Sequence, residues 1–364
     1  MLGNTRIHLT LALLAGATAA TVGCGGGAAT TGSGGSAAES SSSSASSASS
    51  TSNGGPGPDR SSSGGLELVC PFKNQVLAVN SLDFGEGNSG QWKSIGFNLD
   101  GLVTTAASTN VCQPAAGAST LIPYPDGNDG IDNSFGKNLL PDILGIDPTW
   151  TTDVNNSILA GKFTALLELE CLPPTGDVPV LTTKLFAGTT LSSPPKFDGT
   201  DKWPVEPDLL SNPKDPQSST IVFNTCSVTG TAFDAGKNGV IVLTIPITTQ
   251  GQSTSLKLTL YAARLTMTLS ADRKSATGGM LGGVLNTAEF LVQVNKVGYL
   301  LDLCSNSLLA TLLNDIQQAS DILSDGTQDP TKTCDGISMG LGFTMAPAQI
   351  GGVGPAAPMG MTCN

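Results

Sequence analysis

The stretch ISMGLGFTM, residues 337–345, alternates apolar residues with small or polar residues at every step. Alternation with a period of two is typical of a strand that buries one face. Clusters of Gly, Pro and Asn separate this run from others, so the sequence predicts a mainly β fold, a β-sandwich or jelly-roll-like domain. The other predicted strands are 92–105, 162–172, 178–188, 219–230, 239–247 and 255–272, with weaker patterns at 66–72 and 276–285.

A helical hairpin is predicted as an insertion in the β domain, over residues 287–323, which gives the fold an α+β tendency. Apolar residues recur there at helical spacing in two runs, one on each side of Cys304. Asn286 comes just before the first run and Glu289 follows three residues later, a pattern that caps helix N-termini. Shorter helices are predicted at 138–144 and 152–160.

The first residues of the chain predict export. Arg6 lies in the opening segment MLGNTRIH, and residues 9–23 are uncharged and mostly small or aliphatic. Such a segment is too short for a relaxed transmembrane helix and has the pattern of a signal peptide, residues 1–23. It ends at TVGC, which resembles a bacterial lipobox except that Thr21 stands where leucine is usual. The resemblance implies lipid attachment at Cys24, and ordinary secretion with cleavage after Ala19 is the alternative.

The chain from the anchor cysteine onward divides into a tether and a domain. Residues 24–65 consist almost entirely of Gly, Ser, Ala and Thr. Such a composition cannot bury enough apolar surface to offset chain entropy, so we expect a disordered tether followed by a domain over 66–364. Glycine follows Cys24, whereas lipoproteins kept in the inner membrane often carry aspartate there. The lipobox resemblance therefore implies an outer-membrane lipoprotein, and a secreted or periplasmic protein is the alternative.

Charge and histidine content exclude several classes of function. Without residues 1–23, which contain Arg6, 16 Lys and Arg residues face 29 Asp and Glu residues, a net charge of 16 − 29 = −13. An acidic chain of this kind is not expected to bind nucleic acid. The single histidine is His8, inside the predicted signal peptide. Catalysis by Ser-His-Asp or Cys-His groups and histidine-ligated metal sites are therefore excluded from the mature chain.

Eight cysteines are spread along the chain without any C-x-x-C pair. In an exported protein, widely spaced cysteines predict structural disulfides. Cys304 and Cys334 flank one local unit, and we predict a bridge between them. If Cys24 carries a lipid, seven cysteines remain, so one thiol is expected to be free or to pair with another chain.

The segment DGNDGID, residues 126–132, concentrates oxygen-bearing side chains. Calcium takes six to eight oxygen ligands, and Asp126, Asn128, Asp129 and Asp132 supply carboxylate and amide oxygens at close spacing. The spacing is not that of an EF-hand, so a ligand from elsewhere is needed, and Asp100 is our candidate. The alternative is an acidic turn in which Asp and Asn side chains bond to their own backbone. Both interpretations stay open at this point.

Two further places could carry function. The proline-rich segment 194–217 shows no strand pattern and predicts a long surface loop, with Trp203 as an exposed ligand contact, for example for a glycan. Glu168 and Glu170 lie two residues apart and so on one face of a predicted strand, about 7 Å apart. Two carboxyl groups are what a glycosidase needs, although a solvent-facing strand shows the same alternation.

Several motifs taken together carry one family resemblance. The lipobox, the serine-rich tether, GFNLDG, DGIDNSFG and DGISMGLGFT resemble those of uncharacterised predicted lipoproteins of myxobacteria-like Gram-negative bacteria. The likeness extends over most of the chain after residue 66. It implies a location and an architecture, and it brings no activity with it.

Three functions are compatible with these observations. The first is a lipid-anchored, non-catalytic binding or adhesion module, stabilised by calcium, for a glycan or protein ligand. The second is a carboxylate-based polysaccharide hydrolase that uses Glu168 and Glu170. The third is an envelope scaffold that meets another protein through its unpaired cysteine or its helical hairpin.

Overall fold

The computed structural model describes residues 70–87, 90–115, 124–237, 239–249 and 252–363. The predicted signal peptide (1–23), the anchor Cys24 with the tether (24–65), and residues 66–69 of the predicted domain lie outside the described residues.

The described residues form a mainly β domain, as the sequence predicts. They contain eleven strands in one mixed sheet, in which β4 and β11 run parallel and the other pairs are antiparallel. The strands are β1 (Gln75–Asp83), β2 (Thr164–Leu169), β3 (Val178–Gly188), β4 (Lys202–Val205), β5 (Ile221–Thr229), β6 (Ala232–Asp234), β7 (Gly239–Thr249), β8 (Gln252–Leu269), β9 (Ala276–Asn286), β10 (Gly336–Pro347) and β11 (Gln349–Val353).

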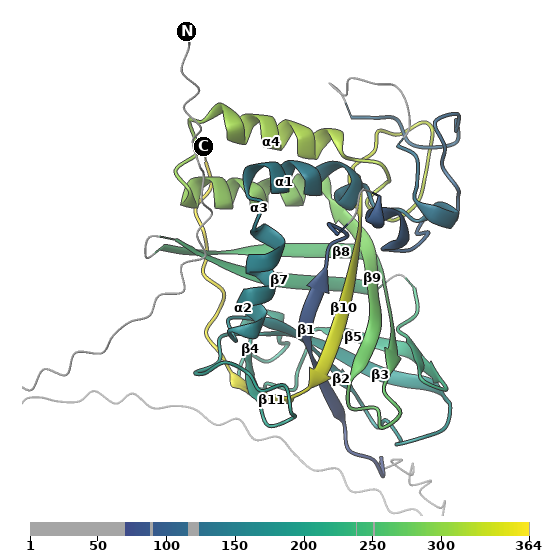
Figure 1. Ribbon diagram of the computed structural model, residues 1–364, viewed down its shortest axis with the longest axis vertical. Helices are drawn as coiled ribbons and strands as arrows, with labels where there is room; N and C mark the ends of the chain where they lie inside the picture. The colour runs from purple at the N-terminus through teal and green to yellow at the C-terminus, as the bar shows by residue number, and fades with distance from the viewer. Residues whose placement is uncertain (1–69, 88–89, 116–123, 238, 250–251, 364) are drawn as a thin grey trace, which may run out of the picture. The chain divides into compact units, whose positions relative to one another are not determined.

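The sheet closes on itself. β3 pairs with β2 along one edge and with β5 along the other, so hydrogen bonding continues through β6, β8, β9, β10 and β1 back to β2. In Figure 1, β1, β10 and β9 form a front layer that crosses β7 and β8 behind it, which gives a sandwich-like arrangement. Apolar side chains fill the space between the layers.

Strand β10 confirms the predicted alternation and extends it. Its apolar residues, including Met339 and Leu341, point into the main core. The opposite face carries Ser338, Gly340 and Gly342, and this face is buried too. A Cβ atom at Gly340 would overlap the carbonyl oxygen of Ile95, because the segment after residue 94 lies directly against β10. The small residues of β10 therefore admit a second layer of chain over the sheet.

The segment that covers β10 was predicted to be a strand, and this prediction is wrong. Residues 92–105 are not a strand: a 3₁₀ turn, Gln91–Ser94, leads into a loop that forms a single bridge, Phe97 to Asp132. Asn133 ties this loop to β10, since its Nδ2 donates to the Ile95 carbonyl oxygen (2.9 Å) and its Oδ1 accepts from the Gly340 amide (3.2 Å). Side chains thus satisfy the backbone groups that a strand would have paired.

Four strands were missed by the sequence analysis: β1, β4, β6 and β11, of which β6 and β11 have only three and five residues. β1 is buried on both faces around Leu77, Ala78 and Val79, so it lacks an alternating pattern. β4 lies in the proline-rich segment and has only four residues. In addition, the weak strand pattern at 66–72 does not lead to a strand at 70–72.

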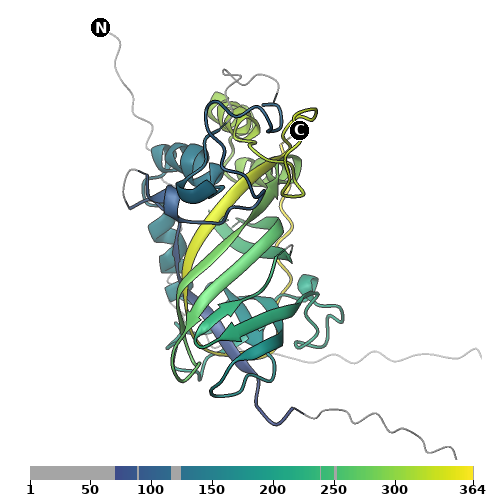
Figure 2. The same ribbon diagram turned by 90° about the vertical axis from the view of Figure 1, so that its right-hand side faces the viewer.

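The predicted helical hairpin is confirmed as α3 (Thr287–Leu300) and α4 (Ser307–Gln318). The Asn286 side chain accepts from the Glu289 amide (3.1 Å), so the predicted cap is formed. The two shorter predicted helices are α1 (Leu140–Ile146) and α2 (Trp150–Leu159). Figure 1 shows α1, α3 and α4 at one end of the closed sheet, and Figure 2 shows β10 and β9 side by side from another direction.

The disulfides correct the predicted pairing. Cys304 and Cys334 are both disulfide-bonded, but the bridges are Cys304–Cys363, Cys112–Cys334 and Cys70–Cys171. The predicted Cys304–Cys334 bridge is wrong because the loop after α4 turns back toward Cys112, where Gln113 and Thr333 form a bridge. Cys226 is the free cysteine of the described chain, and it is fully buried, so it is not accessible to another protein.

The contact between β10 and its covering loop can be tested at Gly340. Replacing Gly340 with alanine should lower the free energy of unfolding by about 1–3 kcal/mol, the usual cost of forcing extra volume into a packed site. Urea unfolding of the purified protein measures this change. Gly352→Ala is the matched control, because a Cβ atom at Gly352 in β11 meets no atom within 4 Å. Equal stability of the two variants would contradict the close contact.

Candidate functional site

The structure places three of the predicted calcium ligands as partners of backbone amides. Asp132 is buried and its Oδ2 accepts from the Leu99 amide (2.7 Å). Asp126 accepts from the Thr104 amide (2.5 Å). Asp100 uses one oxygen for the Leu102 amide (2.8 Å) and the other for the Gln328 side chain (2.9 Å). The Asp100 bond to Leu102 is local, as the acidic-turn interpretation expects, whereas the bonds of Asp126 and Asp132 fasten the acidic segment to the distant covering loop.

The other two candidates point outward. Asn128 and Asp129 are exposed, and Asp129 has a positive φ of 54° within a short 3₁₀ turn. Among the described residues, no group of three or more His, Cys, Asp or Glu side chains is arranged to hold a metal ion. The structure therefore does not bring the five candidate residues together as one ligand set, and calcium binding stays a prediction.

The buried carboxyl groups near this loop form an electrostatically strained cluster. Burial, with repulsion from Asp100 and Asp321, raises the pKa of Asp132 to about 9. Burial likewise raises the pKa of Asp126 to about 6 and that of Asp321 to about 7, and the Lys137 ammonium opposes the rise at Asp126. Each of these groups keeps its proton at a pH where a carboxyl group in water has lost it.

This cluster predicts that the protein becomes less stable as pH rises. A folded-state pKa above the ordinary value means that the folded protein binds more protons than the unfolded chain, so stability falls between about pH 4 and pH 9. Each such group lowers the free energy of unfolding by up to about 1.4 kcal/mol per pH unit. Thermal unfolding at pH 5, 7 and 9 should show a falling midpoint, and Asp132→Asn should flatten the fall above pH 7. A midpoint that rises through this range would contradict the cluster.

Thermal unfolding at different pH values also tests whether the acidic segment binds calcium. A Ca²⁺ ion between these carboxyl groups would favour their charged forms, so calcium binding predicts that millimolar Ca²⁺ raises the midpoint by a few degrees, more at pH 8 than at pH 6. The rise should disappear in EDTA and in Asp129→Asn and Asp132→Asn variants. An unchanged midpoint at both pH values would contradict calcium binding and favour the interpretation of DGNDGID as an acidic turn.

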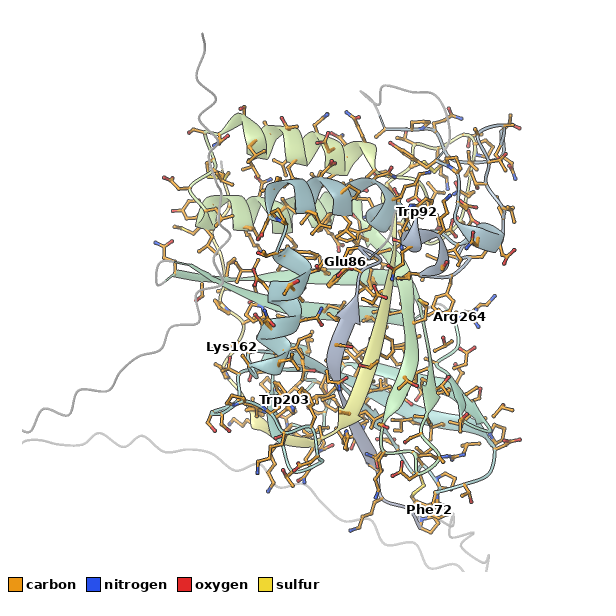
Figure 3. All side chains as sticks on the ribbon, viewed as in Figure 1. Phe72, Glu86, Trp92, Lys162, Trp203 and Arg264 are labelled. Atoms are coloured by element: carbon orange, nitrogen blue, oxygen red, sulfur yellow. A yellow bond between two sulfur atoms is a disulfide. The ribbon has the colours of Figure 1, made fainter. Side chains whose placement is uncertain are left out.

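The prediction that Trp203 is an exposed ligand contact is wrong, because this side chain is fully buried. Trp203, which is labelled in Figure 3, lies on β4. It belongs to a second, smaller apolar cluster with Phe186 and Leu166. Trp203 pairs in register with Ile350 of β11, and Ile350 packs against the same cluster. A short strand inside the proline-rich segment thus turns this side chain toward the sheet.

Glu168 and Glu170 have different environments. Glu168 is only 3% exposed, whereas Glu170 forms an ion pair with Lys184 (2.5 Å). Burial raises the pKa of Glu168. Glu170 is thus paired with a cation and Glu168 is buried, and the hydrolase hypothesis stays a prediction.

The strongest candidate site is an apolar cavity of about 130 Å³ between the helices and the β7–β8 hairpin. Residues from α1, α2, α3, α4, β7 and β8 line it, and most are only half-buried, so it can be reached from solvent. The lining residues are Phe135, Ile143, Ile146, Asp147, Trp150, Ile247, Leu256, Leu258, Phe290, Val294, Val297, Gly298, Leu301, Leu303, Leu308, Leu309 and Leu312.

Asp147 is the one ionisable residue in the cavity wall. It lies between α1 and α2, directly after the last residue of α1, and its Oδ1 accepts from the Thr149 amide (3.0 Å) and from the Thr149 hydroxyl (2.8 Å). Its Oδ2 is buried without a hydrogen-bond partner in the described residues. An unpaired buried acceptor is costly, so a donor on a ligand would remove an existing penalty.

Sequence reasoning located the walls of this cavity but not the cavity itself. The apolar spacing of α3 and α4 predicts helices that pack on the sheet, and it does not reveal space left between them. Asp147 occurs in the sequence IDPTW, where an acidic residue just before a helix has an ordinary capping role. The one sequence feature that pointed to this cavity is the large number of leucines in α4, which face apolar residues of α3.

Comparisons with known proteins give no guide to the function of this site, so its geometry is the basis for interpretation. No protein-family model, curated protein or solved structure matches this chain. In the described parts of the chain, no helix has the length and apolarity needed to cross a membrane.

Proposed function

We propose that this protein is a lipid-anchored, non-catalytic binding module of the cell envelope whose ligand inserts an apolar group into the helical cavity. The observation that carries the proposal is the cavity itself, apolar on all sides except at Asp147. Ligand sites commonly combine apolar walls with a few polar groups that orient the ligand.

The size of the cavity limits the inserted group. An apolar cavity of roughly 150 Å³ in another protein stays dry and accepts benzene, so about 130 Å³ suits a group of about six carbons. Burying six carbons contributes roughly 4–5 kcal/mol at about 0.8 kcal/mol per CH₂. This energy corresponds to a dissociation constant near 1 mM for the hexyl group alone.

The polar end of the ligand should be a hydrogen-bond donor. The free Oδ2 of Asp147 accepts from an ammonium or hydroxyl group and repels a carboxylate. We therefore expect hexylamine to bind most tightly, 1-hexanol less tightly and hexanoate most weakly.

Binding of these probes is measured by Trp150 fluorescence and by thermal unfolding, because Trp150 lines the cavity. At ten times its dissociation constant, hexylamine should stabilise the protein by about 1.4 kcal/mol and raise the midpoint by a few degrees. Val294→Phe should abolish the effect by filling the cavity. Asp147→Asn should weaken hexylamine about tenfold and leave 1-hexanol nearly unchanged.

Val292→Phe is the matched control. Val292 lies on the same helix but is 48% exposed and does not line the cavity. This variant should bind hexylamine as the original protein does. Equal binding by the Val292 and Val294 variants, or no binding of any probe, would contradict the proposal.

Attachment to the outer membrane through Cys24 is part of the proposal. Three disulfides among the described residues are compatible with an exported protein. Cys24→Ala should prevent labelling with radioactive palmitate and release the protein from the membrane fraction of expressing bacteria. Labelling that persists in this variant would exclude Cys24 as the attachment site.

A further inference from the structure

A second hollow lies beside Glu168, away from the helical cavity. Glu168 is on the outer face of β2, between Val76 of β1 and Lys184 of β3 in the strand pairing. It is 3% exposed, although its neighbour Lys184 is already paired with Glu170. A carboxyl group buried to this degree requires hydrogen-bond partners.

Neutral amides provide these partners. The Asn74 Nδ2 donates to Glu168 Oε1 (2.9 Å), and the Gln217 amide, with its nitrogen turned toward Glu168, is 3.2 Å from both carboxylate oxygens. Asn74 Oδ1 accepts from the Cys171 amide (3.2 Å), whereas Gln217 is exposed and can bond to a ligand as well. Burial raises the pKa of Glu168, and the Asn74 hydrogen bond and the charge of Lys184 oppose this rise.

The hollow in front of these residues has a volume of about 420 Å³, within the usual range for ligand sites. Val76 and Ile350 contribute apolar patches to its wall, and Ile350 pairs with Trp203 in the neighbouring strand. Lys274 and Asp198 complete the polar part of the wall. In the described chain, the Lys274 ammonium forms no ion pair.

This combination of groups matches one class of ligand. A hydroxyl group both donates and accepts, so neighbouring hydroxyls can donate to a carboxylate and accept from an amide or an ammonium. A sugar ring also has an apolar face of C–H groups that suits Val76 and Ile350. We propose that the hollow beside Glu168 binds a neutral sugar ring, with Glu168 and Gln217 holding adjacent hydroxyls.

Other ligands fit less well. Glu168 and Asp198 repel a carboxylate or phosphate, and the polar wall does not suit an alkyl chain. Metal binding lacks a ligand set here, since the described residues contain no suitable group of three. The proposal is independent of the helical cavity, which is lined by entirely different residues.

Saturation-transfer difference NMR of the purified full chain tests the proposal with glucose, galactose, N-acetylglucosamine, maltose and cellobiose. At least one of these sugars should bind, and Gln217→Ala and Glu168→Gln should each weaken it tenfold or more. Gln217 is exposed on a loop, so Gln217→Ala keeps the test valid if the buried Glu168 variant fails to fold.

Lys214→Ala is the matched control, because Lys214 is exposed on the same loop outside the hollow, and sugar binding should be unchanged. Hexylamine binding should be unchanged in all three variants, which separates this proposal from the helical cavity. Binding of none of the five sugars, or binding that Gln217→Ala leaves intact, would overturn the proposal.

Discussion

Burial of β10 on both faces is the constraint on which the rest of the structure depends. One face supplies apolar side chains to the core of the closed sheet, and the other consists of small residues, of which Gly340 allows the backbone at Ile95 to lie directly on the strand. Because a second layer of chain can dock there, the acidic segment is held against the sheet. Two of its carboxyl groups, Asp126 and above all Asp132, are then withdrawn from solvent and accept backbone hydrogen bonds.

The closed sheet also explains where ligand sites can form. Its interior is filled by apolar side chains and retains only a small cavity of about 60 Å³. In the described part of the chain, two larger spaces lie where other elements cover the sheet from outside. Helix α3 packs over β8 and α4 packs against α3, and the space toward α1 and α2 is not filled, which leaves the cavity next to Asp147. At β1 and β2, a loop and β11 cover the sheet and leave the hollow beside Glu168.

Local patterns predicted much of this fold, and contacts between distant segments account for the rest. The strand predicted at 178–188 coincides with β3, and the helix after Asn286 begins where its cap predicts, because alternation and capping depend on neighbouring residues. β1 was missed because partners far along the chain bury both of its faces. Trp203 was misplaced for the same reason, since Leu166 and Phe186, which are distant in the sequence, pack with it. Neither the disulfide pairing nor the cavity beside Asp147 follows from spacing alone, because both depend on how complete elements pack.

The most direct test of the central claim is a crystal structure of the protein soaked with 6-bromohexan-1-ol, in which anomalous scattering locates the bromine. The account predicts a bromine peak inside the helical cavity, among α3, α4 and β8, with the hydroxyl group within hydrogen-bond distance of Asp147 Oδ2. A cavity that stays empty at a saturating concentration of this alcohol, or a bromine bound only at the protein surface, would contradict the account.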